Sequence, residues 1–164
     1  MTCWPSQKII AHRIAELSAN PLKAMPHKAQ TTTLQNVARG LLGNFMVVAG
    51  TGHLTFAWQD FQAQVPDFVP LDKDTVVLES GVVEIGLGLA LLFLKGKNRV
   101  RMGVGLAVFY TLIFPGNLHQ YASRISAFGL DTDAKRLGRL FFQPVLIAGA
   151  LWSTGALKVL MKKK

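Results

Sequence analysis

Four stretches of the chain are nearly free of charged residues, and hydrophobic side chains dominate each of them. They cover residues 41–58, 75–94, 102–118 and 140–157. Each is close to the roughly 20 residues that an α-helix needs to cross a hydrocarbon layer of about 30 Å. The pattern therefore predicts an all-α fold, a four-helix transmembrane bundle within residues 37–160. Its spans are expected at about 39–58, 75–94, 100–119 and 138–158.

Composition strengthens this prediction. Only 16% of the 164 residues are charged, whereas about a quarter are charged in an ordinary soluble domain. A soluble domain with four buried helices is the alternative, but helices of this length that are apolar on all sides are unusual outside lipid. The single cysteine, Cys3, excludes an intramolecular disulfide and a CxxC redox pair.

Basic residues mark three segments that must lie on one side of the membrane if the chain crosses it four times. They precede the first span, fill the link between the second and third spans, and close the chain: Lys8, Arg13, Lys23, Lys28, Lys95, Lys97, Arg99, Arg101, Lys158, Lys162, Lys163 and Lys164. Because basic loops favour the cytoplasm, both termini are expected there, in a bacterial inner (plasma) membrane. The net charge of +9 is then explained by the basic segments on the cytoplasmic side, which meet anionic lipid headgroups. No nucleic acid is expected as a partner.

Two segments outside the spans leave alternatives open. Residues 1–36 are expected to be a basic cytoplasmic tail, either flexible or forming a short amphipathic helix on the membrane face. The loop 59–74 mixes apolar and acidic residues with two prolines, Pro66 and Pro70. It is expected to lie along the headgroups, either as a lid over the bundle or as a simple wetted connector.

Polar residues from all four predicted spans fall in the same half of the membrane. The candidate ligand-binding or buried polar cluster is His53, Glu79, Ser80, Glu84, Asn117, His119, Arg139 and Gln143. Ionisable groups in spans are costly and usually face the protein interior or a cavity. Ser80, Glu84 and Gly88 share one helix face, whereas Glu79 is turned by roughly 140° from Glu84.

Several roles for this cluster are compatible with the sequence. Glu84 is either interhelical glue, bonded to His53 or Asn117, or a proton-relay or ligand-binding group. A metal site from His53, His119 and a glutamate has no tight ligand motif behind it, and a haem held by the two histidines has less support still. No catalytic residue and no metal ligand is assigned. Arg139 either reaches the headgroups or pairs with Glu79.

Four short motifs carry a resemblance to a known family. They are AGTGH at 49–53, VPDFVP at 65–70, SGVVEIGLG at 80–88 and FPGNLH at 114–119. In order and spacing they resemble the DoxX-like family of small four-helix integral membrane proteins, over roughly residues 37–160. The family pattern carries over to His53, Pro66, Pro70, Glu84, Pro115 and Asn117.

The resemblance implies four transmembrane helices and a link to membrane redox chemistry, but no established catalytic residue. The family takes its name from a small subunit of a thiosulfate:quinone oxidoreductase; other members are linked to oxidative-stress tolerance, and distant animal relatives are receptor-assembly chaperones. The first hypothesis is therefore a small accessory subunit of a quinone-linked membrane complex, with quinone as the candidate cofactor and the bilayer, a larger redox complex or a second copy as partner.

Two other functions remain open. One is a binding or carrier protein for protons or a small molecule, and the other is an assembly chaperone that offers glycine-rich helix faces to a partner. A stand-alone enzyme is not expected, because the sequence has no nucleophile elbow, phosphate loop or metal motif.

Overall fold

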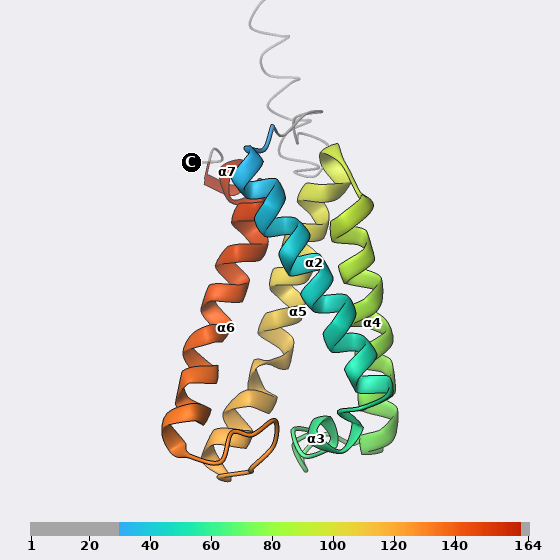
Figure 1. Ribbon diagram of the computed structural model, residues 1–164, viewed down its shortest axis with the longest axis vertical. Helices are drawn as coiled ribbons and strands as arrows, with labels where there is room; N and C mark the ends of the chain where they lie inside the picture. The colour runs from blue at the N-terminus through green and yellow to red at the C-terminus, as the bar shows by residue number, and fades with distance from the viewer. Residues whose placement is uncertain (1–29, 162–164) are drawn as a thin grey trace, which may run out of the picture.

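The computed structural model describes residues 30–161, and this part of the chain is entirely helical apart from turns and loops. The helices are α2 (Thr33–Leu54), α3 (Trp58–Gln62), α4 (Lys73–Phe93), α5 (Gly96–Ala122), α6 (Asp133–Ser153) and α7 (Ala156–Met161). The four long ones run alternately up and down (Figure 1). Short α7 lies at one end of the bundle and short α3 at the other, and these ends are called the α7 end and the α3 end. The prediction of an all-α fold is confirmed.

Capping decides where the first long helix begins and ends. Thr32 and Gln35 form a capping box, in which the Gln35 amide donates to Thr32 Oγ1 at 3.2 Å and the Thr32 amide donates to Gln35 Oε1 at 2.9 Å. Such a box satisfies amides that a helix start leaves free, so α2 begins at Thr33. At its other end the amides of Thr55 and Ala57 both turn back to the Gly52 carbonyl, and α2 ends at Leu54. The helix is thus shifted toward the N-terminus from the expected 39–58; most of the expected tail, residues 1–29, lies outside the described part of the chain.

The last long helix shows a similar shift. Thr132 accepts a hydrogen bond from the Lys135 amide and starts α6 at Asp133, before the expected 138. Gly155, with φ of +79°, ends it and allows the turn into α7. This backbone conformation is easily reached only by glycine. The segment expected to span at about 138–158 is therefore divided between α6 and α7.

Close contact between glycines joins α2 to α4. A Cβ atom built on Gly50 would lie 2.6 Å from the Gly81 carbonyl oxygen, and one built on Gly88 would lie 2.7 Å from the Gly43 carbonyl oxygen. Only residues without a side chain let two backbones approach in this way. Gly81 and Gly88 of α4 therefore face α2, whereas Gly86 has no atom within 4 Å of its built Cβ.

The bundle consists of two helix pairs, α2 with α4 and α5 with α6. A core of buried side chains from all four helices lies between them: Met46, Leu91, Leu106, Tyr110 and Ala150. At the α7 end the pairs are tied together, because Gln35 Nε2 donates to the Trp152 carbonyl at 2.7 Å and Arg99 Nη1 donates to Thr31 Oγ1, just before α2, at 3.0 Å. Toward the α3 end the two pairs diverge (Figure 1).

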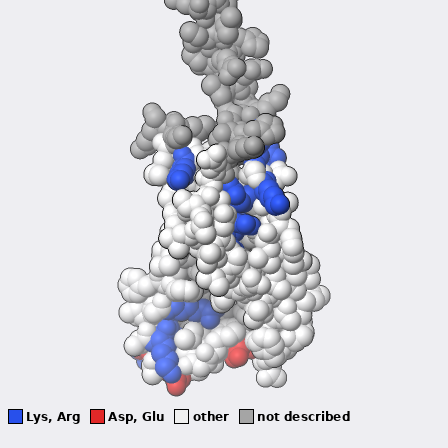
Figure 2. All heavy atoms as spheres, turned by 45° about the horizontal axis from the view of Figure 1, so that its top comes forward, with Lys and Arg blue, Asp and Glu red and all other residues white. Residues whose placement is uncertain are grey.

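Two helices, α4 and α5, are long and apolar enough to cross a membrane, with mean hydropathies of 2.0 and 1.2 over their most apolar windows. On the face seen in Figure 2, lysine and arginine atoms gather toward the two ends of the bundle, and a band of uncharged surface lies between them. Pro115 lies inside α5, which continues as one helix to Ala122.

Candidate functional site

Two cavities lie where the helix pairs diverge. One, of about 290 Å³, lies between α4 and α5 beneath the loop that contains Val65 and Phe68. The other, of about 590 Å³, lies between α2 and α6 and is walled by apolar side chains such as Phe45 and Leu146. Five residues line both cavities: Phe61, Glu84, Ile113, Asn117 and Arg139. The two cavities therefore meet at a set of polar groups in the middle of the bundle.

On the α2–α4 side of this meeting point stand His53, Ser80 and Glu84, which we call the acid pole. The Ser80 hydroxyl lies 2.9 Å from His53 Nδ1 and donates to the Val77 carbonyl at 3.0 Å. His53 Nε2 faces Glu84 Oε2 at 3.5 Å. Neither of these two atoms has a hydrogen-bond partner, although both side chains are buried.

The close approach of α2 and α4 builds this pole. A Cβ on Gly81 would lie 2.7 Å from the His53 Cβ, so the absence of a side chain there is what lets the imidazole lie against α4. Ser80 and Glu84 are four residues apart and hence on one helix face. Of the two partners considered for Glu84, Asn117 donates to Gln143 instead, and His53 Nε2 lies 3.5 Å from Glu84 Oε2.

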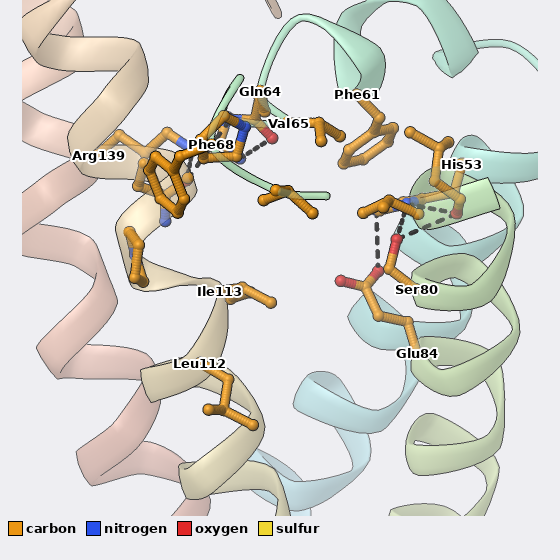
Figure 3. A pocket seen from close by; sticks show the side chains of 17 residues that line it. His53, Phe61, Gln64, Val65, Phe68, Ser80, Glu84, Leu112, Ile113 and Arg139 are labelled. Carbon is orange, nitrogen blue, oxygen red and sulfur yellow. Dashed lines mark hydrogen bonds and ion pairs between the residues drawn. The ribbon is translucent and has the colours of Figure 1, made fainter. Parts of the chain in front are cut away.

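On the α5–α6 side stand Gln64, Asn117, Arg139 and Gln143, which we call the arginine pole. Arg139 Nε donates to Asn117 Oδ1 at 3.0 Å, and its Nη2 donates to Gln64 Oε1 at 3.1 Å. Asn117 Nδ2 in turn donates to Gln143 Oε1 at 3.0 Å. Figure 3 shows Arg139 on the wall of the smaller cavity opposite His53, Ser80 and Glu84.

Two aromatic rings, one from the short helix α3 and one from the α5–α6 loop, cover the cavities at the α3 end. The Phe61 ring of α3 stacks on His53 with centroids 3.3 Å apart, and Phe128 meets Phe61 edge-on at 4.6 Å. The guanidinium of Arg139 lies 4.8 Å from the centroid of the Phe128 ring, within the range of a cation–π contact. The cover thus contacts both poles at once.

The remainder of the 63–72 loop is held by polar contacts at the surface. Lys73 Nζ donates to Asp67 Oδ1 at 2.9 Å, and this hydrogen bond holds the pKa of Asp67 below its usual value. Gln62 also donates to the Asp74 carboxylate. Of the two interpretations of this loop, the structure favours a cover over a simple wetted connector, because Phe61 and Gln64 reach the polar residues beneath it.

Most of the predicted cluster comes together, and two members do not. His53, Ser80, Glu84, Asn117, Arg139 and Gln143 surround the cavities. Glu79 is exposed, so its predicted pairing with Arg139 is wrong; the arginine is bound by amide oxygens instead. His119 turns to Ser123 at 3.4 Å.

The metal and haem alternatives both use His53 and His119, which the structure does not bring together in either cavity. His119 is not among the residues that line either cavity with His53. Within residues 30–161, no group of three or more histidine, cysteine or acidic side chains is placed to hold a metal ion.

Three residues of the site were missed by the sequence analysis. Gln64 and Phe61 lie in the loop that was considered only as a possible lid, and Phe128 lies in the α5–α6 loop with φ of +56°. A glutamine between two aromatic residues in a covering loop could have been noticed. The position of Phe128 depends on a backbone turn that no sequence pattern predicts.

Residues 42–154 match a family described as a domain of unknown function, DUF8561. The chain belongs to this family. The match to DUF8561 includes both poles, the covering loops and the glycines that join α2 to α4, and leaves out α7. No curated protein and no solved structure matches the chain.

Proposed function

We propose that this protein is a four-span integral membrane protein that binds a lipid-soluble molecule with a polar head between its two poles. All four long helices expose large apolar side chains on the outside of the bundle: Leu41 (69% exposed), Phe93 (72%), Leu112 (71%) and Phe141 (71%). A soluble bundle rarely leaves such a surface facing water. In a bilayer the same side chains face acyl chains.

The distribution of charge supports an orientation as well. Exposed basic residues lie at both ends of the described chain: Lys95, Arg101 and Lys158 at the α7 end, with Lys97 partly covered, and Lys73, Arg124 and Lys135 at the α3 end. The α3 end differs in its acidic residues. Exposed carboxylates lie at the α3 end, among them Asp67, Asp72, Asp74, Asp131 and Asp133. By the preference of basic loops for the cytoplasm, the α7 end and both termini are cytoplasmic and the poles lie in the outer half of the membrane.

Labelling of single cysteines tests this topology. In a chain with Cys3→Ser, Lys97→Cys should react with an impermeant maleimide only in inverted membrane vesicles. Asp67→Cys and Asp131→Cys should react only in intact cells. Labelling of all three positions from the same side would contradict the four-span arrangement.

The observation that supports ligand binding most strongly is the unpartnered oxygen of Glu84. Its Oε2 is buried, has no hydrogen-bond partner, and belongs to a residue that lines both cavities. Buried polar groups are nearly always hydrogen-bonded, and ionisable groups within spans usually mark functional sites. A molecule with a polar head and an apolar body satisfies the head at the poles and places its body in the apolar cavities.

Mass spectrometry of the protein purified from its own membranes tests the binding. A lipid-soluble molecule is expected in the native sample and in Val108→Trp, which changes an outward-facing side chain of α5. It is expected to be absent from Ile113→Trp, because Ile113 lines both cavities and the larger ring fills their meeting point. Equal recovery from both variants, or recovery no greater than from empty detergent, would overturn the proposal.

The role of accessory subunit to a membrane redox complex is the second candidate, as the resemblance to the DoxX-like family suggests. A flat ring with two carbonyl oxygens, such as a quinone, suits a space with donors on one wall and an acid–imidazole pair on the other. Purification in mild detergent tests it. Copurification of an oxidase or dehydrogenase is expected, and a lone monomer or homodimer without one would refute the accessory role.

A further inference from the structure

We infer that the bound molecule is a single-chain lipid-soluble acid whose anionic oxygen pairs with Arg139. This inference rests on the proposed function and adds the charge of the ligand to it. Three observations carry it: the missing counter-ion of Arg139, the direction of the amide hydrogen bonds around it, and the position of Glu84 on the opposite wall.

Arg139 has no carboxylate at ion-pair distance among residues 30–161. The ion pairs of this part of the chain involve His53, Lys73, Arg124, Lys135 and Arg136. Arg139 instead donates to the side-chain oxygens of Asn117 and Gln64. Neutral amide oxygens solvate a guanidinium but leave its net charge in place. A partly buried cation in an apolar cavity is favourable to an anion that enters the same cavity.

The amides around Arg139 all have their nitrogens engaged elsewhere. Asn117 Nδ2 donates to Gln143, Gln143 Nε2 donates to the Tyr110 carbonyl at 2.6 Å, and Gln64 Nε2 donates to Gln120 Oε1 at 2.8 Å. The oxygens of Asn117 and Gln64 accept from the arginine, whereas the Gln143 oxygen accepts from Asn117. An anionic oxygen at this pole finds its donors on the guanidinium, whose planar fork suits a carboxylate.

The one buried carboxyl group nearby does not fill this role. Glu84 lies across the cavity from Arg139 (Figure 3), where its Oε2 is 3.5 Å from His53 Nε2. The two opposite charges attract each other across the cavity, but they form no ion pair. The wall formed by Arg139 can therefore pair with a carboxylate that belongs to the ligand. The larger cavity, of about 590 Å³ with walls that include Phe45, Val48 and Phe142, lies in the size range of a site for one small ligand. It fits one hydrocarbon chain rather than a two-chain phospholipid.

A pair of probes that differ only in charge tests the inference. Binding of radiolabelled dodecanoate and dodecanol to the purified protein is measured by equilibrium dialysis at mildly alkaline pH, with empty micelles as the background. We expect dodecanoate to bind about tenfold more tightly, the size of one or two charge-assisted hydrogen bonds. The preference should disappear in Arg139→Gln and persist in Arg101→Gln, which removes an exposed charge at the α7 end.

A second variant keeps the inference testable if Arg139→Gln misfolds. Gln64→Glu replaces the oxygen that lies 3.1 Å from Arg139 Nη2 with a carboxylate, so the protein supplies its own counter-ion and the preference should fall while dodecanol still binds. If dodecanol binds the native protein as tightly as dodecanoate, the inferred charge is wrong but the proposed binding function stands. If neither probe binds above background, the proposed function itself fails. A preference that survives both Arg139→Gln and Gln64→Glu also overturns the inference.

Discussion

Substituting Gly50 with alanine tests whether α2 and α4 approach as closely as the structure has them. The new methyl group would lie 2.6 Å from the Gly81 carbonyl oxygen, 2.8 Å from Ile85 Cγ1 and 2.9 Å from the Ile85 amide nitrogen. Two of these three atoms belong to the backbone of α4, so a rotamer change cannot relieve the overlap and one helix must move. Overpacking of this kind costs about 1–3 kcal/mol.

Gly40→Ala is the matched control, because it lies on the same helix and its built Cβ meets no atom within 4 Å. Alanine there is expected to stabilise the protein by about 0.5–1 kcal/mol through helix propensity alone. The free energies of unfolding of the two variants should therefore differ by roughly 2 kcal/mol or more, measured by circular dichroism during titration of mixed micelles with a denaturing detergent. If Gly50→Ala proves as stable as Gly40→Ala, the two helices do not meet at this glycine and the acid pole built on their contact is wrong.

Three further predictions concern the ends and the cover of the bundle. Gln35→Leu removes a helix cap and the bond to the Trp152 carbonyl, and should lower the free energy of unfolding by about 1–3 kcal/mol in the same assay; an unchanged value would contradict the tie between the helix pairs. Phe61→Ala removes the stacked ring of the cover and should speed the reaction of Ile113→Cys with a small maleimide, and an unaltered rate would mean that the ring does not limit access. The hydrogen bond from Lys73 lowers the pKa of Asp67, so its stabilising effect is present above the ordinary carboxyl pKa and is lost as the pH falls through the lowered value. Titration of the Asp67 carboxyl by NMR should give a higher pKa in a Lys73→Met variant, and equal values in both proteins would refute the contact.

The existence of the four long helices could be predicted from hydropathy, whereas their ends depend on single hydrogen bonds. A run of apolar residues shows that a helix is favourable but not which residue caps it. The box formed by Thr32 and Gln35 was present in the sequence as a T-x-x-Q pattern, and it extends α2 into residues that were assigned to the tail. Gly155 is likewise readable as a helix stop, and it separates α7 from α6.

The depth of the site residues in the bundle could be predicted from the sequence, but the directions of their side chains could be predicted only in part. Residues at similar depths in four helices are brought near one another by the up-and-down arrangement, so the grouping of Glu84, Asn117 and Arg139 followed from their positions along the chain. The rotation of roughly 140° between Glu79 and Glu84 predicted that they would not share a partner, and one is exposed while the other is buried. Which partner each group takes could not be predicted, because Gln64 and Phe128 reach the site from irregular loops.

The position of the cavities follows from where the helix pairs are able to approach. At the α7 end, a Cβ on Gly103 would overlap Thr154 Oγ1, so this glycine lets α5 lie against the end of α6. Hydrogen bonds from Gln35 to Trp152 and from Arg99 to Thr31 fasten the two pairs there. Gly86 of α4 and Gly105 of α5 are exposed, and built Cβ atoms on them meet nothing within 4 Å, so neither glycine brings another helix close. The pairs therefore separate with distance from the fastened end, and the polar side chains stand where they separate. Bringing the pairs together at the α3 end would strip the remaining solvation from an arginine without a counter-ion, which is unfavourable. The charge of Arg139 thus helps to keep the site open, as binding of the proposed acid requires.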